Sequence, residues 1–209
     1  AGTLHAALGL SPVAHGKLVA IDIERLRAEP GVTAVYTAAD IPGVNDVGPI
    51  VHGDDPILAD GVVHYLGQPM FAVIAADRRI ARRVAARAKE FVTIEPLPAL
   101  RTAREAHAAK AYVVPPMHLA RGDAHAAIAA APHRFKDSLS IGGQEHFYLE
   151  GQIAYAIPLE DGQMLVHCST QHPTEMQHAV AHALGLHANQ VQVQCRRMGG
   201  GFGGKESQS

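Results

Sequence analysis

A run of glycines near the end of the sequence restricts what this chain can fold into more than any other feature. Five of the six residues from 199 to 204 are glycine. An ordered glycine costs about 0.5–1 kcal/mol relative to alanine, so such a run is worthwhile only where the backbone approaches another group closely or adopts a positive φ. Val191, Val193 and Cys195 alternate with polar residues before it, which predicts a half-buried strand. We therefore predict a ligand-binding turn directly after a strand, where α/β folds place such turns.

Two nucleotide-binding patterns fit the glycine run formally, and neither is specific. Gly199, Gly201 and Gly204 satisfy G-x-G-x-x-G, but a cluster this dense satisfies many templates. Residues 199–205 also satisfy the G-x-x-x-x-G-K part of a phosphate-binding loop, in which the next residue is a Ser or Thr that binds Mg²⁺. Here the next residue is Glu206, whose carboxylate would repel phosphate. The sequence thus argues against a nucleoside triphosphate site.

Composition indicates a folded protein and narrows the range of partners. The 209 residues are 47% hydrophobic and 18% charged, with a net charge of −2. This balance predicts neither nucleic acid nor an anionic membrane as a partner, and no apolar stretch reaches the roughly 20 residues that span a bilayer. The two cysteines, Cys168 and Cys195, form no Cys-x-x-Cys pair and predict reduced thiols in a cytoplasmic protein. Because the sequence opens at Ala1 without Met, within a predicted strand, we expect residues upstream.

Strand-like and helix-like segments alternate along the first hundred residues. Their order predicts a small α/β domain. Asp77 is the predicted N-cap of the main helix. The outer face of this helix carries arginines, which we expect to be exposed to solvent. The predicted strands are 4–10, 17–22, 32–36, 70–76 and 91–94, the predicted helices are 23–29 and 77–89, and a loop is predicted over 41–60.

The second half contains a connector and a further unit. Residues 99–140 are rich in alanine and histidine, with helical pieces predicted at 102–109 and 124–131. In the unit that follows, Pro173 and Gly185 are typical of the first turn and the end of a helix. Strands are predicted at 153–157, 164–168 and 191–195.

Two groups of polar residues in this second unit can each be interpreted in two ways. His178 and His182 have the i, i+4 spacing that can hold zinc, but with no glutamate between them and no third ligand nearby we expect ordinary helix histidines. The run Gln144-Glu145-His146 lies between a double glycine and two aromatics. Polar groups that become buried need partners, so this run fits either a polar cofactor or a hydrogen-bonded interdomain junction.

Four segments together resemble a known family. They are YLGQP (65–69), GGQEHFYLE (142–150), STQHPTEMQ (169–177) and RRMGGGFGGKE (196–206). They occur in the order seen in the molybdopterin-binding subunit of xanthine dehydrogenases, which are molybdenum hydroxylases. The resemblance implies an α+β (α/β) fold: an α/β hammerhead domain over 1–98, a connector over 99–140, and over 141–209 the incomplete start of a molybdopterin-binding domain.

The resemblance also assigns roles to five residues. Gln171 matches the glutamine whose side-chain amide donates a hydrogen bond to an oxo ligand of the metal, and Phe202 and Gly203 match the loop pair whose backbone N–H groups approach the same oxygen ligands. Gly201, in the same loop, is also expected to bind the cofactor. Glu206 matches the glutamate that binds the purine. Gln171 and Glu206 are thus the expected catalytic residues, and no residue is expected to bind molybdenum directly. Donors fixed by a glycine loop are preorganised for negatively charged oxygens.

The implied reaction is oxidation of hypoxanthine and xanthine to urate, with oxygen from water. Besides molybdenum–molybdopterin, the complete complex is expected to carry 2Fe-2S clusters and FAD on a partner subunit that passes electrons to NAD, in a dimer of heterodimers without nucleic acid or membrane. The catalytic base is expected in the remainder of the molybdopterin subunit, beyond Ser209, so this segment alone would be inactive. The alternatives are an aldehyde or other N-heterocycle hydroxylase of this family and a non-catalytic interaction module.

Overall fold

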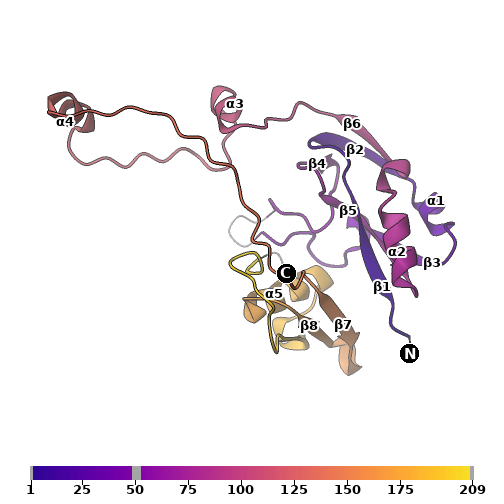
Figure 1. The fold of residues 1–209 in the computed structure, drawn as a ribbon. Helices are drawn as coiled ribbons and strands as arrows, with labels where there is room; N and C mark the ends of the chain where they lie inside the picture. The colour runs from indigo at the N-terminus through magenta and orange to yellow at the C-terminus, as the bar shows by residue number, and fades with distance from the viewer. Residues whose placement is uncertain (1, 49–52, 208–209) are drawn as a thin grey trace. The chain divides into compact units, whose positions relative to one another are not determined.

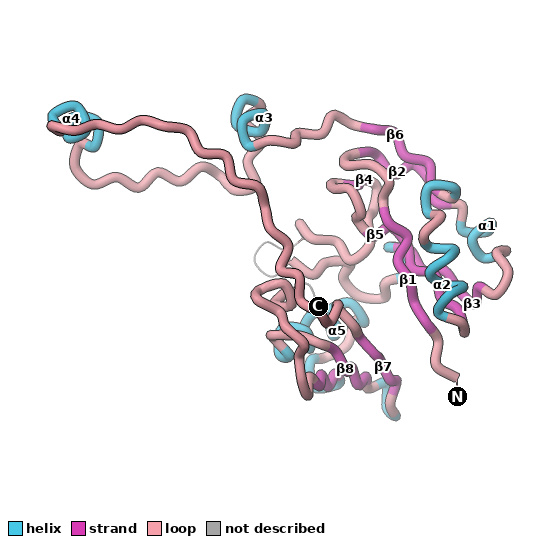
Figure 2. Tube along the Cα trace, viewed as in Figure 1, coloured by secondary structure: helices cyan, strands magenta, loops and turns pink. Residues whose placement is uncertain are grey.

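The computed structural model describes residues 2–48 and 53–207. The chain divides into two compact units, one formed by Ala1–Ala99 with His146–Ser209 and the other by Leu100–Glu145. Figures 1 and 2 show their helices and strands. Part of the loop predicted over 41–60, residues 49–52, lies outside the described residues, as does Ala1, and the first strand begins at His5.

The first sheet has a buried central strand. Strand β5 (Pro69–Ala75) lies between β1 (His5–Leu10) and β3 (Val32–Thr37), and both pairings are antiparallel. Phe71 of β5 is fully buried, and Gly9 of β1 makes room for it, because a Cβ at that position would lie 2.2 Å from the ring. The buried run predicted over 70–76 is therefore confirmed as the centre of a sheet.

The second sheet completes the N-terminal region. Strand β2 (Gly16–Ile21) lies between β4 (Val62–Val63) and β6 (Val92–Pro96), again antiparallel on both sides. The short helix α1 (Ile23–Arg27) follows β2, and its Leu26 is fully buried. The described strand pairings of this region are antiparallel, and its helices pack against these sheets. This is the arrangement of an α+β fold.

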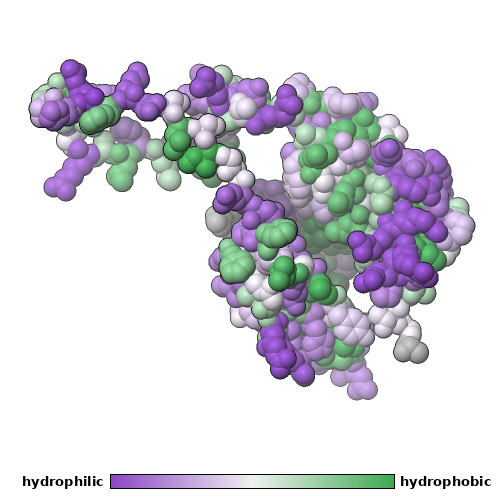
Figure 3. Space-filling model, viewed as in Figure 1, coloured by the Kyte–Doolittle hydropathy of each residue, from purple (hydrophilic) through white to green (hydrophobic). Residues whose placement is uncertain are grey.

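Helix α2 (Arg78–Ala85) covers this core with its alanine and valine face. Asp77 caps it as predicted, since its carboxylate accepts a hydrogen bond from the Arg79 N–H at 2.7 Å. The helix ends four residues earlier than predicted, and a 3-10 turn, Ala88–Glu90, brings Phe91 into the core. Its other side is strongly hydrophilic in Figure 3 and carries Arg78, Arg79, Arg82 and Arg83, which are exposed.

The third sheet lies in the C-terminal region and has mixed directions. Strand β8 (Met164–Cys168) pairs antiparallel with β7 (Ala154–Pro158) and parallel with β9 (Val191–Gln194). A parallel pair needs a crossover, and helix α5 (Pro173–Leu184) supplies it. Pro173 begins this helix and Gly185, with φ 65°, ends it, as the sequence predicts.

A loop of the N-terminal region closes the end of α5. The N–H groups of Gly43 and Val44 donate to the carbonyls of Ala183 and His182 at 3.0 and 2.9 Å. A Cβ on Gly43 would lie 1.9 Å from the His182 oxygen, so only glycine permits this approach. The contact satisfies the Ala183 carbonyl, which the last helical turn leaves without a partner, and adds a second donor to the His182 carbonyl, which also accepts from the Gly185 N–H at 3.2 Å.

The unit Leu100–Glu145, all of which is described, has no buried residue. It contains α3 (Ala103–Ala108), with a Thr102/Glu105 capping box, and α4 (Ala124–Ala130), capped by Asp123. Val113, Leu119 and Phe135 are almost fully exposed, at 99, 100 and 97%. A segment that buries no residue has no hydrophobic core of its own.

Among the helices of residues 2–48 and 53–207, none has the length and apolar character needed to span a membrane.

We predict that Phe71 is the main support of the first sheet. Phe71→Ala is expected to lower the free energy of local opening by about 3–5 kcal/mol, because a buried ring leaves a cavity. Hydrogen exchange of the β1, β3 and β5 amides measures this. Tyr36→Ala, on the half-exposed Tyr36 of β3, is the matched control, and equal effects of the two substitutions would contradict the prediction.

Candidate functional site

The glycine loop, residues 199–206, follows β9 as the sequence predicts, after a short bend. Gly200 and Gly203 have φ values of 102° and 95°, and Phe202 between them has φ 52°. A positive φ is unusual for a bulky residue and persists only where the surroundings hold it. The loop is therefore a fixed conformation whose supports can be identified.

Gln171 is the first support. Its side-chain oxygen accepts hydrogen bonds from the N–H groups of Gly203 and Lys205 at 2.9 and 3.3 Å, and its own backbone N–H donates to the Lys205 carbonyl at 2.7 Å. Because two backbone donors converge on one side-chain atom, that atom is the amide oxygen and the NH₂ group is at the other end. Gln171 thus binds the loop with its acceptor end.

Two hydrogen-bond donors are left over by this arrangement. The Gln171 NH₂ group and the Phe202 N–H have no hydrogen-bond partner among residues 2–48 and 53–207. Phe202 lies between Gly201 and Gly203, both of which contact the Gln171 side chain. The Gly203 N–H, by contrast, already donates to Gln171. Of the predicted donors, Gln171 and Phe202 are free for a ligand, whereas Gly203 supports the loop.

The glycines allow the loop to lie directly against other parts of the protein. A Cβ on Gly201 would lie 2.5 Å from the Gln171 side-chain oxygen, and one on Gly204 would lie 2.7 Å from the Tyr148 ring. At Gly199 the obstacle would be Glu150, at 2.5 Å. The close approach predicted from the glycine run is therefore made, in this structure, to protein side chains.

Lys205 is the second support and is completely buried, with 0% exposure. Its ammonium donates to Glu150 at 3.0 Å and to the Ser169 hydroxyl at 2.8 Å, and it lies 4.6 Å from the centre of the Tyr148 ring. Burying a charge is costly unless it is paired and hydrogen-bonded, and these three neighbours meet that requirement. The ammonium group is consequently engaged within the protein, which removes the lysine that a phosphate-binding loop would need.

Glu150 links several of these groups through one carboxylate oxygen. That oxygen accepts from the Lys205 ammonium, from the Gly199 N–H at 2.8 Å and from the Ser169 hydroxyl. The Ser169 hydroxyl, then the Gly199 N–H and the Lys205 ammonium, lower the pKa of Glu150 from 4.5 to about 2. The carboxylate is therefore ionised at neutral pH, and its charge is used to hold the loop.

The remaining predicted residues lie on the outside of the loop. Phe202 is 76% exposed, and Glu206 is exposed and forms no hydrogen bond or ion pair with another described residue. Gly201 is buried against Gln171. The structure thus brings Gln171, Gly201 and Gly203 into direct contact and leaves the Phe202 ring and the Glu206 carboxylate free.

Sequence reasoning missed the residues that support the loop. It left the run at 144–146 open between a cofactor and a junction, and it gave no role to Tyr148, Glu150, Ser169 or Lys205. In the structure, Gln144 and Glu145 are exposed, whereas His146 and Tyr148 border the loop at Gly204. A signal was present, because a lone lysine within a glycine run needs an acidic partner if the run packs closely.

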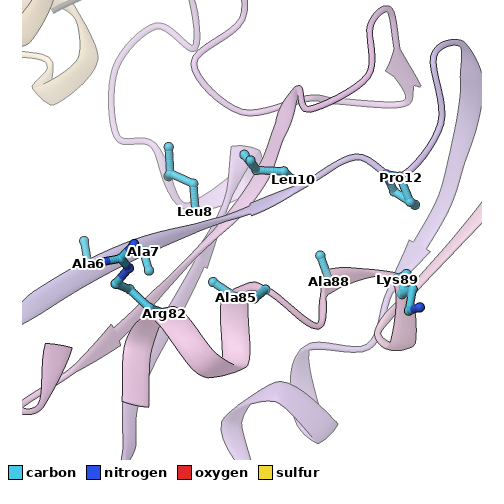
Figure 4. A pocket seen from close by; sticks show the side chains of 10 residues that line it. Ala6, Ala7, Leu8, Leu10, Pro12, Arg82, Ala85, Ala88 and Lys89 are labelled. Carbon is cyan, nitrogen blue, oxygen red and sulfur yellow. The ribbon is translucent and has the colours of Figure 1, made fainter. Parts of the chain in front are cut away.

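The other candidate sites do not gather comparable chemistry. Within the described residues, no three His, Cys, Asp or Glu side chains are placed to hold a metal ion, and His178 and His182 remain exposed helix residues. Cys168 and Cys195 are free thiols, and burial raises the pKa of Cys168. A groove of about 650 Å³ beside β1 and α2 is lined mainly by alanines, leucines and a proline, with Arg82 and Lys89 as its charged groups (Figure 4).

Comparisons with known proteins agree with the fold. Residues 1–98 match the aldehyde oxidase and xanthine dehydrogenase a/b hammerhead domain, and residues 105–209 match the molybdopterin cofactor-binding domain. The chain is 38% identical to a xanthine dehydrogenase of Calliphora vicina over 99% of its length. It spans only 15% of that relative.

Solved structures give the same result. Quinoline 2-oxidoreductase from Pseudomonas putida superimposes with a TM-score of 0.82 and 27% identity, over 98% of this chain and 28% of its own. Aldehyde oxidoreductase from Desulfovibrio gigas gives a TM-score of 0.81 and 27% identity, over 98% and 24%. The chain therefore belongs to the xanthine dehydrogenase and aldehyde oxidase family of molybdenum hydroxylases, from which it carries the hammerhead domain and a piece of the molybdopterin-binding region.

Proposed function

We propose that this chain supplies one wall of the molybdenum site in an enzyme that oxidises hypoxanthine and xanthine to urate. Water supplies the oxygen and NAD is the final acceptor. The observation that carries the proposal is the orientation of Gln171, whose acceptor end binds the glycine loop while its NH₂ group has no partner in the described chain.

The unused donors fit the cofactor. The NH₂ group of Gln171, which binds the loop, and the N–H of Phe202, which lies in the loop, are both neutral donors in fixed positions. The oxygen ligands of molybdenum are acceptors that carry negative charge. Both residues would thus donate hydrogen bonds to the oxygen ligands of the molybdenum–molybdopterin cofactor, with no direct protein bond to the metal. When bound, the cofactor supplies the redox chemistry that inserts oxygen into a heterocycle.

Glu206 is the substrate-binding and catalytic carboxylate of the proposal. It follows the buried Lys205 directly, is exposed, and has no partner among the described residues, so its carboxylate is available to a ligand. A carboxylate accepts hydrogen bonds from the N–H groups that a purine presents. An aldehyde presents no such donor, so Glu206 favours the purine.

The complete enzyme is proposed to be cytoplasmic and larger than this chain. The remainder of the molybdopterin subunit would provide the catalytic base, and a partner subunit with 2Fe-2S clusters and FAD would carry electrons to NAD, in a dimer of heterodimers. The 15% coverage of the Calliphora relative supports a longer polypeptide. The proposed domain limits are 1–98 for the hammerhead, 99–140 for the connector and 141–209 for the start of the molybdopterin-binding domain.

A second candidate is oxidation of another N-heterocycle or of an aldehyde. It is favoured by the two solved structures, a quinoline oxidoreductase and an aldehyde oxidoreductase, that share this fold at TM-scores of 0.82 and 0.81. Turnover of xanthine, quinoline and an aromatic aldehyde by the full-length holoenzyme separates these candidates. Turnover of the aldehyde alone would overturn the purine assignment.

The role of Gln171 is tested by Gln171→Glu. Glutamate keeps an oxygen for the Gly203 and Lys205 N–H groups but replaces the NH₂ donor with an acceptor, so the loop stays in place while the cofactor contact is lost. We expect kcat to fall roughly 100-fold, the loss typical of one missing donor to a charged oxygen, with hydrogen exchange of residues 199–206 unchanged. Gln171→Leu is the matched control, because it removes both contacts and should also accelerate that exchange. Unchanged kcat in Gln171→Glu would refute the proposed donor.

The role of Glu206 is tested by Glu206→Gln in the same holoenzyme. We expect lower turnover of xanthine at unchanged molybdenum content, because the amide keeps the shape of the side chain and loses its charge. A loss of roughly tenfold or more is expected for a charged hydrogen bond to substrate. Steady-state kinetics and metal analysis measure the two quantities. The exposed Glu160→Gln serves as a control, and wild-type kinetics in Glu206→Gln would remove the substrate role.

A further inference from the structure

We propose that Lys205 and Glu150 are positioning residues whose ion pair, formed by a buried ammonium and a partly exposed carboxylate, locks the glycine loop and thereby fixes Phe202 and Glu206 for the reaction. The inference rests on the proposed function for what the loop presents. It concerns one loop residue, Lys205, whose side chain is fully buried, and Glu150, which contacts the loop from the segment before β7 with a side chain that is 37% exposed.

Glu150 contacts the loop near both of its ends. One oxygen of Glu150 accepts from the Gly199 N–H at 2.8 Å, where the loop begins, and from the Lys205 ammonium at 3.0 Å, where it ends. Gln171 holds the middle through the Gly203 N–H at 2.9 Å. Other hydrogen bonds also hold the loop, among them one from the Gln152 side chain to the Gly204 carbonyl at 3.2 Å, but the Glu150 carboxylate contacts both Gly199 and Lys205.

A loop with this many glycines needs contacts that restrict its conformation. Glycine loses more conformational freedom on ordering than any other residue, so five glycines in six residues favour a mobile loop. Phe202 is additionally held at φ 52°, a conformation that requires support from its surroundings. Each contact that removes this freedom keeps the Phe202 N–H and the Glu206 carboxylate in one place.

The Lys205–Glu150 contact differs from an ordinary packing contact because both side chains are charged. Lys205 has 0% exposure, whereas the Glu150 side chain has 37%. Removing Glu150 alone leaves a buried ammonium without its counter-charge, which is costly, whereas removing both charges leaves neither buried alone. The two substitutions are therefore expected to be strongly non-additive.

The experiment uses the full-length holoenzyme with Glu150→Gln, Lys205→Met and the double variant. Hydrogen exchange is followed at residues 199–206, with α5 as the internal reference. We expect exchange of the loop to become roughly 10- to 100-fold faster in Glu150→Gln, with α5 unchanged, and part of the protection to return in the double variant. Glu90→Gln is the matched control, because it breaks an exposed ion pair with Arg87 at 2.8 Å.

A pH series adds a readout that a purely structural contact would not change. The charged group that faces Glu150 is Lys205, while Ser169 and Gly199 contribute neutral donors. The pKa of Glu150 is lowered from 4.5 to about 2, so its contribution is complete above pH 4.5 and is lost as the pH falls toward 2. Loop protection, normalised to α5, should decline over this window in the wild-type protein and stay flat in Glu150→Gln.

The outcomes separate this inference from the proposed function. Faster loop exchange in Glu150→Gln, together with an altered Mo(V) EPR spectrum at unchanged molybdenum content, supports both. Faster exchange with no molybdenum in the wild-type protein supports the lock and overturns the proposed cofactor. Unchanged loop exchange, an additive double variant or the same pH profile in Glu150→Gln and wild type would each overturn the lock.

Discussion

The ion pair between the buried Lys205 ammonium and the partly exposed Glu150 carboxylate is the interaction on which the site depends. A lysine ammonium with no exposure to solvent is stable only beside a counter-charge and further acceptors, and Glu150, Ser169 and Tyr148 supply these. Because the same Glu150 oxygen also accepts from the Gly199 N–H, one carboxylate contacts the loop near both of its ends. We propose that the exposed residues of the site, Phe202 and Glu206, take their positions from this contact.

Glycine has a structural purpose in this arrangement that is separate from ligand binding. Side chains at Gly199, Gly201 or Gly204 would collide with Glu150, Gln171 or Tyr148. The absence of side chains lets the loop pack on the segment before β7 and on the turn after β8, which provide all of these contacts. Gln171 then serves two partners at once: its oxygen holds the loop, and its NH₂ group is left for the cofactor that the family implies.

The N-terminal region and the third sheet contribute rigidity to this site. A core centred on Phe71 and Met70 stabilises the hammerhead sheets, and Gly43 and Val44 bind the last carbonyls of α5. Helix α5 in turn begins directly after Gln171 and His172. The start of the helix and the turn that carries Gln171 are therefore one continuous element, which limits the freedom of the side chain that touches the loop.

The sequence by itself determined most of the main helices and strands, the α5 boundaries at Pro173 and Gly185, the cap at Asp77 and the glycine loop after β9, because these follow from local patterns of apolar, helix-ending and turn-forming residues. It did not indicate the two-residue strand β4. The four family segments also identified the residues now proposed for the cofactor and substrate. Only the tertiary structure decided that Gly203 donates to Gln171, that Lys205 is buried on Glu150, and that the sheets of the first region are antiparallel. Pairings between residues 32 to 55 positions apart leave no periodic trace in the sequence, since they depend on how strands and turns pack together.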